Sequence, residues 1–242
     1  MFAGLIGRSQ KGCRKRETIR YNPWKGRRMK SITEFRPLED VELPARFSEV
    51  IGKWRSLAAK FFYDGPVVWL VPAGFSILDS EHWPLLPREL RKRAEAIAGW
   101  KFLDREGETT RRQLVFGLPI PLDGSERKNV QQQQAFLADL RKQYQLPESH
   151  LSAFGKTSTL VGLILAYNAI SGEAGVWDGK LVRTDTLLNS AWDELDPARP
   201  HGQYWALSVC DRYIASSFPE ERSTHLCCCA LGEEQLQPGE LE

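Results

Sequence analysis

The chain has 242 residues, of which 42% are hydrophobic and 26% are charged, and its formal net charge is +2. These proportions are typical of a globular protein, and the longest apolar run, residues 160–170, is too short to cross a bilayer. Five cysteines, three of them consecutive, do not suggest a disulfide framework. We therefore expect a soluble cytoplasmic protein with reduced thiols and no membrane association, and no motif implies a cofactor.

The charge is distributed unevenly along the chain. The first 28 residues contain nine Lys or Arg and a single Glu, whereas the other 214 residues contain 24 basic and 30 acidic residues. A basic segment on an acidic body suggests a charged partner, and nucleic acid is the partner that basic and stacking aromatic side chains suit best. The candidate nucleic-acid-binding residues are Arg14, Lys15, Arg16, Arg20, Trp24, Lys25, Arg27 and Arg28.

A second interpretation of this arm concerns the start of translation. Met1 and Met29 are the only methionines, and Met29 lies where the basic excess ends. Translation from Met29 would remove the arm, so both interpretations stay open. The domain organisation that we expect is a disordered basic arm over 1–36, a single domain over 37–232 and a disordered acidic tail over 233–242.

Helices and strands alternate in the first part of the domain. Apolar residues at steps of three and four predict amphipathic helices, and short runs rich in Val and aromatic residues predict strands. The expected elements are a helix over 47–61, a strand over 66–71, a helix beginning at Pro87, a strand over 113–118 and a helix capped by Ser125. The run of glutamines at 131–134 is interpreted as the solvated surface of that last helix.

The helix expected near 158–171 differs from the others because its apolar residues point in nearly every direction. A helix of this kind is buried, so we place it at the centre of the core, with Gly172 after its last residue. Short strand-like runs follow at 180–184, 204–210, 213–218 and 225–231. The sequence thus predicts an α+β fold, with helices in the N-terminal two-thirds packed around this buried helix and an antiparallel β region at the C-terminal end.

Gly155, Lys156 and Thr157 precede the buried helix and form a candidate anion site. Backbone amides at a helix N-terminus favour anions, and Lys156 would add a positive charge. A complete phosphate-binding loop would need a glycine five positions before Gly155, where this chain has His150. Simple capping of the helix is the alternative interpretation.

Cys210, His225, Cys227 and Cys229 form a candidate zinc set. Alternation along a strand would place His225, Cys227 and Cys229 on one face, and Cys210 could complete a tetrahedral site. The spacing lacks the short turns of zinc fingers, so a packed core strand is the alternative. Cys227 or Cys229 would act as a nucleophile only if a neighbouring group lowered the pKa of its thiol.

No catalytic residue set emerges from these patterns. The function that we expect is a non-enzymatic binding or accessory role, in which the loop tryptophans Trp83, Trp177 and Trp192 contact a protein partner or pack back onto their own domain. One alternative is nucleic-acid association through the basic arm, with the basic residues at 88–93 as a second patch. The other is a small hydrolase or phosphate-handling enzyme built on Lys156 or on His225 and Cys227.

Overall fold

The computed structural model describes residues 34–100, 102–172, 180–188, 205–210, 214–217 and 222–241. In this part of the chain, no helix is both long and apolar enough to cross a membrane. The α-helices are α1 (Ser48–Lys60), α2 (Arg88–Ala98), α3 (Val130–Gln143) and α4 (Thr157–Ser171). The strands are β1 (Arg36–Pro37), β2 (Val68–Val71), β3 (Gln113–Leu118), β4 (Leu181–Leu188), β5 (Trp205–Val209), β6 (Ile214–Ser217), β7 (Leu226–Cys227) and β8 (Ala230–Gln235). The class is α+β, as the sequence predicts.

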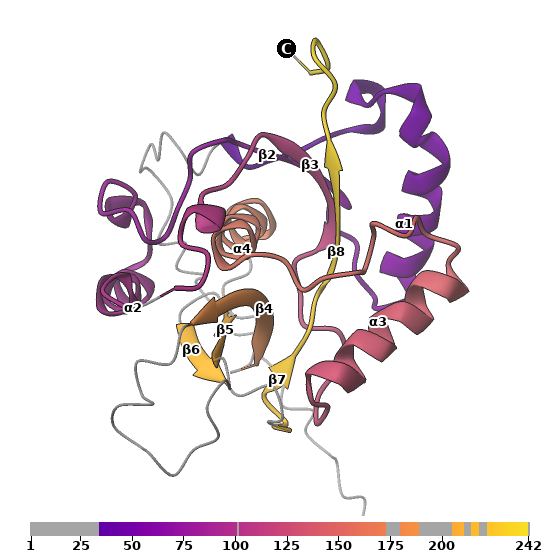
Figure 1. Ribbon diagram of the computed structural model, residues 1–242. Helices are drawn as coiled ribbons and strands as arrows, with labels where there is room; N and C mark the ends of the chain where they lie inside the picture. Colours follow the sequence, from indigo (N-terminus) through magenta and orange to yellow (C-terminus); the bar gives the residue numbers. More distant parts are fainter. Residues whose placement is uncertain are drawn as a thin grey trace, which may run out of the picture.

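The strands form two sheets, which Figure 1 shows above and below the long helix at the centre. The first sheet has the order β1-β2-β3-β8, and all its neighbours are antiparallel. The second has the order β6-β5-β4-β7, in which only the β4–β7 pair is parallel. The C-terminal strands are therefore divided between two sheets, because β8 crosses over to pair with β3.

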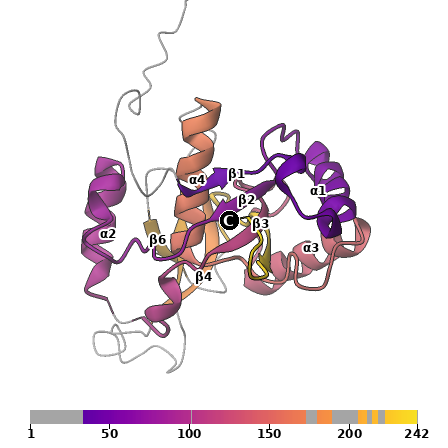
Figure 2. The same cartoon turned by 90° about the horizontal axis from the view of Figure 1, so that it is seen from above.

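Helix α4 lies between the two sheets, and it contacts β2 of the first sheet and β4 and β5 of the second (Figure 1 and Figure 2). Its apolar side chains point in every direction, and Leu160, Leu163 and Ile164 are completely buried. Gly172 ends the helix with a φ of 67°, a conformation that glycine adopts at little cost. The predicted buried helix is confirmed in both position and environment.

The other face of the first sheet packs against α1, and buried hydrogen bonds through a histidine connect the two. Trp54 of α1 donates its indole Nε1–H to Nδ1 of His150 at 2.9 Å, and Nε2 of His150 lies 3.0 Å from Oε1 of Glu234 on β8. The indole is a donor only, so Nδ1 accepts and Nε2 carries the proton. Gly232 is required here, since a Cβ at that position would lie 2.4 Å from the His150 ring.

The start of α3 differs from the sequence prediction. Asn129, not Ser125, is the N-cap, and it forms a reciprocal capping box with Gln132. Ser125 is buried in the preceding turn, where its hydroxyl donates to Leu122 O and accepts from the Cys228 amide. One of the glutamines expected at the surface, Gln133, is fully buried and donates from Nε2 to the carbonyls of Ser125 and Leu226.

The acidic C-terminal segment begins as part of a strand. The sequence predicts a disordered tail from residue 233, but Glu233, Glu234 and Gln235 form the end of β8, which pairs with β3. Glu240 then pairs with Arg46 at 2.6 Å. The apolar partners of this segment are far away in the sequence, which is why its polar composition misled the prediction.

Candidate functional site

The candidate anion site lies at the start of α4, but the amides there already have acceptors within the protein. Gly155, at a φ of 83°, donates its N–H to Oδ2 of Asp185 at 2.8 Å. The Thr157 amide donates to Oγ1 of Thr186 at 2.9 Å, and the Ser158 amide lies 3.4 Å from Oε2 of a buried carboxylate contributed by another segment. These are the amides that an external anion would need.

That buried carboxylate belongs to Glu108, at the end of the 3₁₀ helix η5 (Glu106–Glu108). Its Oε1 accepts a hydrogen bond from the Thr186 hydroxyl at 2.5 Å, and Thr186 in turn accepts one from the Thr157 hydroxyl at 2.7 Å. All three side chains are at most 1% exposed. Burial raises the pKa of Glu108, although the hydrogen bond from Thr186 opposes this shift.

Lys156 does not face the helix amides. Its Nζ lies 3.4 Å from Oδ2 of Asp104 in a partly exposed ion pair. Burial also raises the pKa of Asp185, with the Gly155 amide acting in the opposite direction. An external anion at this helix start would have to displace the carboxylates of Glu108 and Asp185. The N-cap is Lys156, which makes no side-chain cap hydrogen bond, so the helix start is capped by side chains of Glu108, Asp185 and Thr186 and not by Gly155, Lys156 and Thr157.

The candidate zinc set is divided between the interior and the surface. Cys210, Cys227 and Cys229 are buried, whereas His225 is exposed. Strand β7 ends at Cys227, so the alternation that would align the three C-terminal side chains on one strand is interrupted. Among the described residues, no group of three or more His, Cys, Asp or Glu side chains is arranged to hold a metal ion.

The thiols of the three consecutive cysteines are not activated. Burial raises the pKa of Cys227 to about 11 and that of Cys228 to about 12. The pKa of Cys229 is raised well above its usual value for the same reason. A nucleophilic cysteine needs a lowered pKa, so these residues are packing groups of the core.

Two surface features singled out in the sequence support the fold locally. Arg91, from the basic patch of α2, donates Nε–H to Trp83 O at 2.8 Å and thereby holds the 3₁₀ helix η4 (Trp83–Leu85) against α2. Trp83 donates its indole N–H to Ile77 O at 3.0 Å. This loop tryptophan packs back onto its own domain. Trp177, Trp192 and the candidate nucleic-acid-binding residues of the arm lie outside the described residues.

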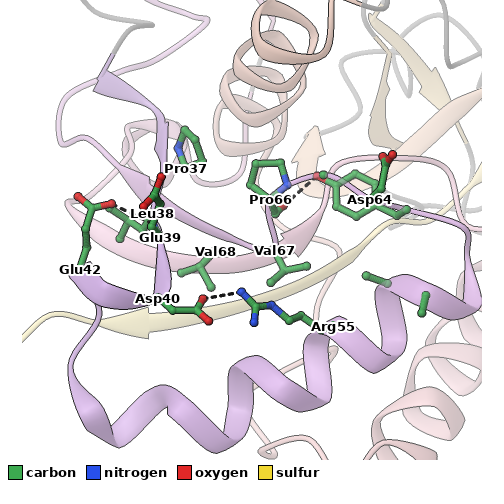
Figure 3. A pocket seen from close by; sticks show the side chains of 14 residues that line it. Pro37, Leu38, Glu39, Asp40, Glu42, Arg55, Asp64, Pro66, Val67 and Val68 are labelled. Atoms are coloured by element: carbon green, nitrogen blue, oxygen red, sulfur yellow. Dashed lines mark hydrogen bonds and ion pairs between the residues drawn. The ribbon is translucent and has the colours of Figure 1, made fainter.

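A cavity of about 690 Å³ opens between the segment after β1, the C-terminal half of α1 and the loop that leads into β2 (Figure 3). The chain reaches the cavity because Leu38 continues the pairing of β1 and donates its N–H to Val68 O at 3.0 Å. It then turns through the 3₁₀ helix η2 (Asp40–Glu42). The lining residues come from three stretches of the sequence, namely 37–42, 55–59 and 63–68.

The charged groups of this cavity are mostly carboxylates. Its lining includes four acidic residues and one basic residue, which are Glu39, Asp40, Glu42, Asp64 and Arg55. In the view of Figure 3, the first three carboxylates lie toward one side and Asp64 toward the other. A concave site in which one sign of charge predominates attracts a ligand of the opposite charge.

Two of the four carboxylates already hold a guanidinium group. Glu42 accepts a hydrogen bond from Arg36 at 2.6 Å, and Asp40 accepts one from Arg55 at 2.7 Å. The pKa of Glu42 is lowered by the Glu39 amide and by Arg36, so this carboxylate is ionised at neutral pH. Glu39 and Asp64, in contrast, form no ion pair with any other described residue. The Glu39 carboxylate accepts the Glu42 amide in the capping box of η2, so it is held in place by the backbone but has no cationic partner among the described residues.

The floor of the cavity is apolar. Ala58, Val67 and Val68 line it and are themselves buried. The Tyr63 hydroxyl donates a hydrogen bond to Pro66 O at 2.8 Å and thereby holds the loop that leads into β2. Carboxylates above an aliphatic floor suit a side chain that has a charged end and an apolar stem, as Lys and Arg do.

A second cavity of about 550 Å³ lies beside η4 and η5. Its charged lining residues are Asp79, Glu106 and Arg105, and Arg105 donates to the Ala98 carbonyl at 2.7 Å. No single charge predominates there to the same degree, so the cavity beside η2 is the stronger candidate.

Comparisons with protein-family models, with curated proteins and with solved structures found no significant match for this chain. The case for a site therefore depends on the geometry of the molecule. Sequence reasoning missed the cavity because its walls come from three separate stretches of residues 37–68 that only the fold arranges around a hollow. The available signal was the cluster of Glu39, Asp40 and Glu42 directly before a helix.

Proposed function

We propose that this protein binds a cationic peptide segment, and that a Lys or Arg side chain of that segment enters the cavity beside η2. The observation that carries the proposal is the presence of two carboxylates, Glu39 and Asp64, that line a concave site and form no ion pair within the described part of the chain. The sequence predicts a non-enzymatic binding role through the tryptophan loops. The proposal keeps the binding role but assigns it to the cavity beside η2.

The cavity's own ion pairs support this choice of ligand. Arg36 and Arg55 each place a guanidinium nitrogen within 2.7 Å of a carboxylate of the same wall. A guanidinium presents several donors in a planar fork that matches a carboxylate, which makes Arg the most suitable ligand side chain. The aliphatic stem of the ligand would cover Val67 and Val68 at the cavity floor.

The proposal is tested by titrating N-acetylated, C-amidated tetra-arginine into the full chain by isothermal calorimetry at low salt. Glu39→Gln combined with Asp64→Asn removes both carboxylates with little change in volume. Exposed ion pairs contribute about 0.2–1 kcal/mol each, so losing two of them should weaken binding by up to about 30-fold. Raising the ionic strength should weaken binding to the unmodified protein as well.

The matched control is Glu95→Gln combined with Asp139→Asn, which removes two exposed carboxylates from α2 and α3 and leaves the cavity unchanged. Binding should remain within about twofold of that of the unmodified chain. Equal weakening by both double variants would reduce the effect to net charge and reject the cavity as the site. Absence of any binding at millimolar peptide would reject the function.

A further inference from the structure

We infer that the occupant of this cavity is the chain's own basic segment, residues 20–28, which would compete with cationic ligands supplied by other molecules. The inference rests on the proposed function, because it names the partner of the same cavity. The segment has the sequence Arg-Tyr-Asn-Pro-Trp-Lys-Gly-Arg-Arg and contains no acidic residue.

The first observation is the point at which the chain enters the fold. Phe35 is buried at 3% exposure, and Arg36 and Pro37 pair with β2. Pro37 is also a lining residue of the cavity. The chain is therefore fixed from Phe35 onward, and Arg28 is seven residues before Phe35. Seven residues span at most about 25 Å, which is longer than a cavity of this volume requires.

The second observation is complementary charge. Arg20, Lys25, Arg27 and Arg28 give the segment four positive charges, while the cavity has four carboxylates and a single guanidinium among its lining residues. Arg36 already pairs with Glu42 of this wall at 2.6 Å, and it is the first basic residue of the part of the chain that the structure describes.

The third observation is an exposed aromatic residue next to the cavity in the sequence. Phe62 is 96% exposed, and the two residues that follow it, Tyr63 and Asp64, line the cavity. The segment 20–28 has Tyr21 and Trp24 among its basic residues. An exposed aromatic that directly precedes lining residues of a charged pocket in the sequence suits a partner that carries both residue types, because aromatic and cation–π contacts add to the ion pairs.

Attachment to the same chain makes this segment a strong competitor. A short tether gives an effective concentration on the order of millimolar, and the segment weakens binding of a free ligand by about the ratio of this concentration to the segment's own dissociation constant. With a dissociation constant of about 0.1 mM for the segment, neutralising it should raise the affinity for a free peptide about tenfold. The segment would limit occupancy of the cavity until another partner removes it.

The experiment measures fluorescence anisotropy of a fluorescein-labelled peptide with the sequence of residues 20–28, added to full-length protein. The test variant carries Arg20→Gln, Lys25→Gln, Arg27→Gln and Arg28→Gln. The control variant carries Arg8→Gln, Lys11→Gln, Arg14→Gln and Lys15→Gln, which removes the same charge from the preceding part of the arm. We expect the peptide to bind the test variant about tenfold more tightly than the unmodified chain, and the control variant within about twofold of it.

The outcomes separate this inference from the function on which it rests. Equal affinity for the unmodified chain and the test variant would overturn self-occupancy and leave cavity binding intact. No binding to the test variant would reject both. Tightening by the control variant to the same extent would show a general charge effect and would also overturn the inference.

A covalent readout distinguishes binding within one chain from binding between two copies. Carbodiimide coupling joins a lysine amine directly to a carboxylate, so Lys25 should link to Glu39 or Asp64 within a single chain. Peptide mass spectrometry of the monomer band identifies the link, and its yield should not depend on protein concentration. Links found only in covalent dimers would overturn the inference.

Discussion

The carboxylates at the start of α4 and those in the cavity beside η2 differ in where their acceptor oxygens point. Glu108 and Asp185 face inward, where hydroxyl and amide donors use their oxygens. Glu39 and Asp64 line an open cavity and have no ion pair within the described part of the chain. Buried carboxylates at the start of a helix thus stabilise the fold, whereas exposed carboxylates that line a cavity remain available to a ligand.

The largest expected effect comes from removing the inward-facing carboxylate. Glu108→Ala leaves the Thr186 hydroxyl and the Ser158 amide without their acceptor in the core. Each buried donor left unpaired costs about 1–3 kcal/mol, so the free energy of unfolding should fall by about 2–6 kcal/mol. Urea unfolding followed by circular dichroism measures this change.

The control for this prediction is Glu106→Ala, in the same turn but exposed. It should change the unfolding free energy by less than about 0.5 kcal/mol. If Glu108→Ala were equally mild, the two sets of carboxylates would not differ as described.

A smaller loss is expected at the hydroxyl that joins α4 to Glu108. Thr186→Val preserves the side-chain shape but removes the acceptor of the Thr157 amide at 2.9 Å. One buried amide without a partner should lower the free energy of unfolding by about 1–3 kcal/mol. Thr224→Val, at an exposed turn, is the control in the same urea assay and should be nearly neutral. A neutral Thr186→Val would mean that this hydrogen bond contributes nothing to stability.

The contributions of Glu108 and Glu42 to the free energy of unfolding should respond to pH in opposite directions. Burial raises the pKa of Glu108 above its ordinary value of 4.5, so its contribution to stability is present below pH 4.5 and is lost as the pH rises through the folded-state pKa. The pKa of Glu42 is lowered, so its contribution is present above its unfolded-state pKa and is lost on acidification.

The measurement is the unfolding free energy at pH 8, pH 5 and pH 3 for the unmodified chain, Glu108→Gln and Glu42→Gln. From pH 8 to pH 5 the unmodified protein should gain stability relative to Glu108→Gln, and from pH 5 to pH 3 it should lose stability relative to Glu42→Gln. The same sign for both variants would contradict the assigned environments.

The smallest effect on stability is expected from the carboxylates proposed to bind a ligand. Glu39→Gln combined with Asp64→Asn removes exposed charges that form no ion pair with a described residue, and the glutamine that replaces Glu39 keeps a side-chain oxygen that can still accept the Glu42 amide in the capping box of η2. The unfolding free energy should therefore change by less than about 0.5 kcal/mol. Thermal or urea unfolding tests this directly. A loss above 2 kcal/mol would assign these residues a structural role and remove the reason to regard them as available.

Much of the fold could be predicted because the signals are local. The apolar residues of α4 and Gly172 after it mark a buried helix, and the α+β class follows from the order of the elements. The pairing of β8 with β3 could not be predicted, since it joins residues more than 100 positions apart whose polar sequence resembles a tail. The Asn129 and Gln132 capping box was visible in the sequence and was missed in favour of Ser125.

The candidate site was harder to predict for the same physical reason. Gly155, Lys156 and Thr157 resemble an anion site locally, but the groups that fill it, Glu108 and Asp185, come from other segments. The cavity is formed in the same way, by three stretches that only the fold brings together. Local chemistry identifies donors and acceptors, whereas tertiary contacts decide which of them remain available.

The central claim is that a cation binds beside η2 and that α4 does not provide an anion site. Amide chemical-shift mapping of the ¹⁵N-labelled full chain during a tetra-arginine titration tests it most directly. The largest shifts should fall on the amides of residues 38–42 and 63–68, with Glu39 and Asp64 among them, and the amide signals of residues 155–158 should not move. Shifts centred on residues 155–158, or none beside η2 at saturating peptide, would contradict it.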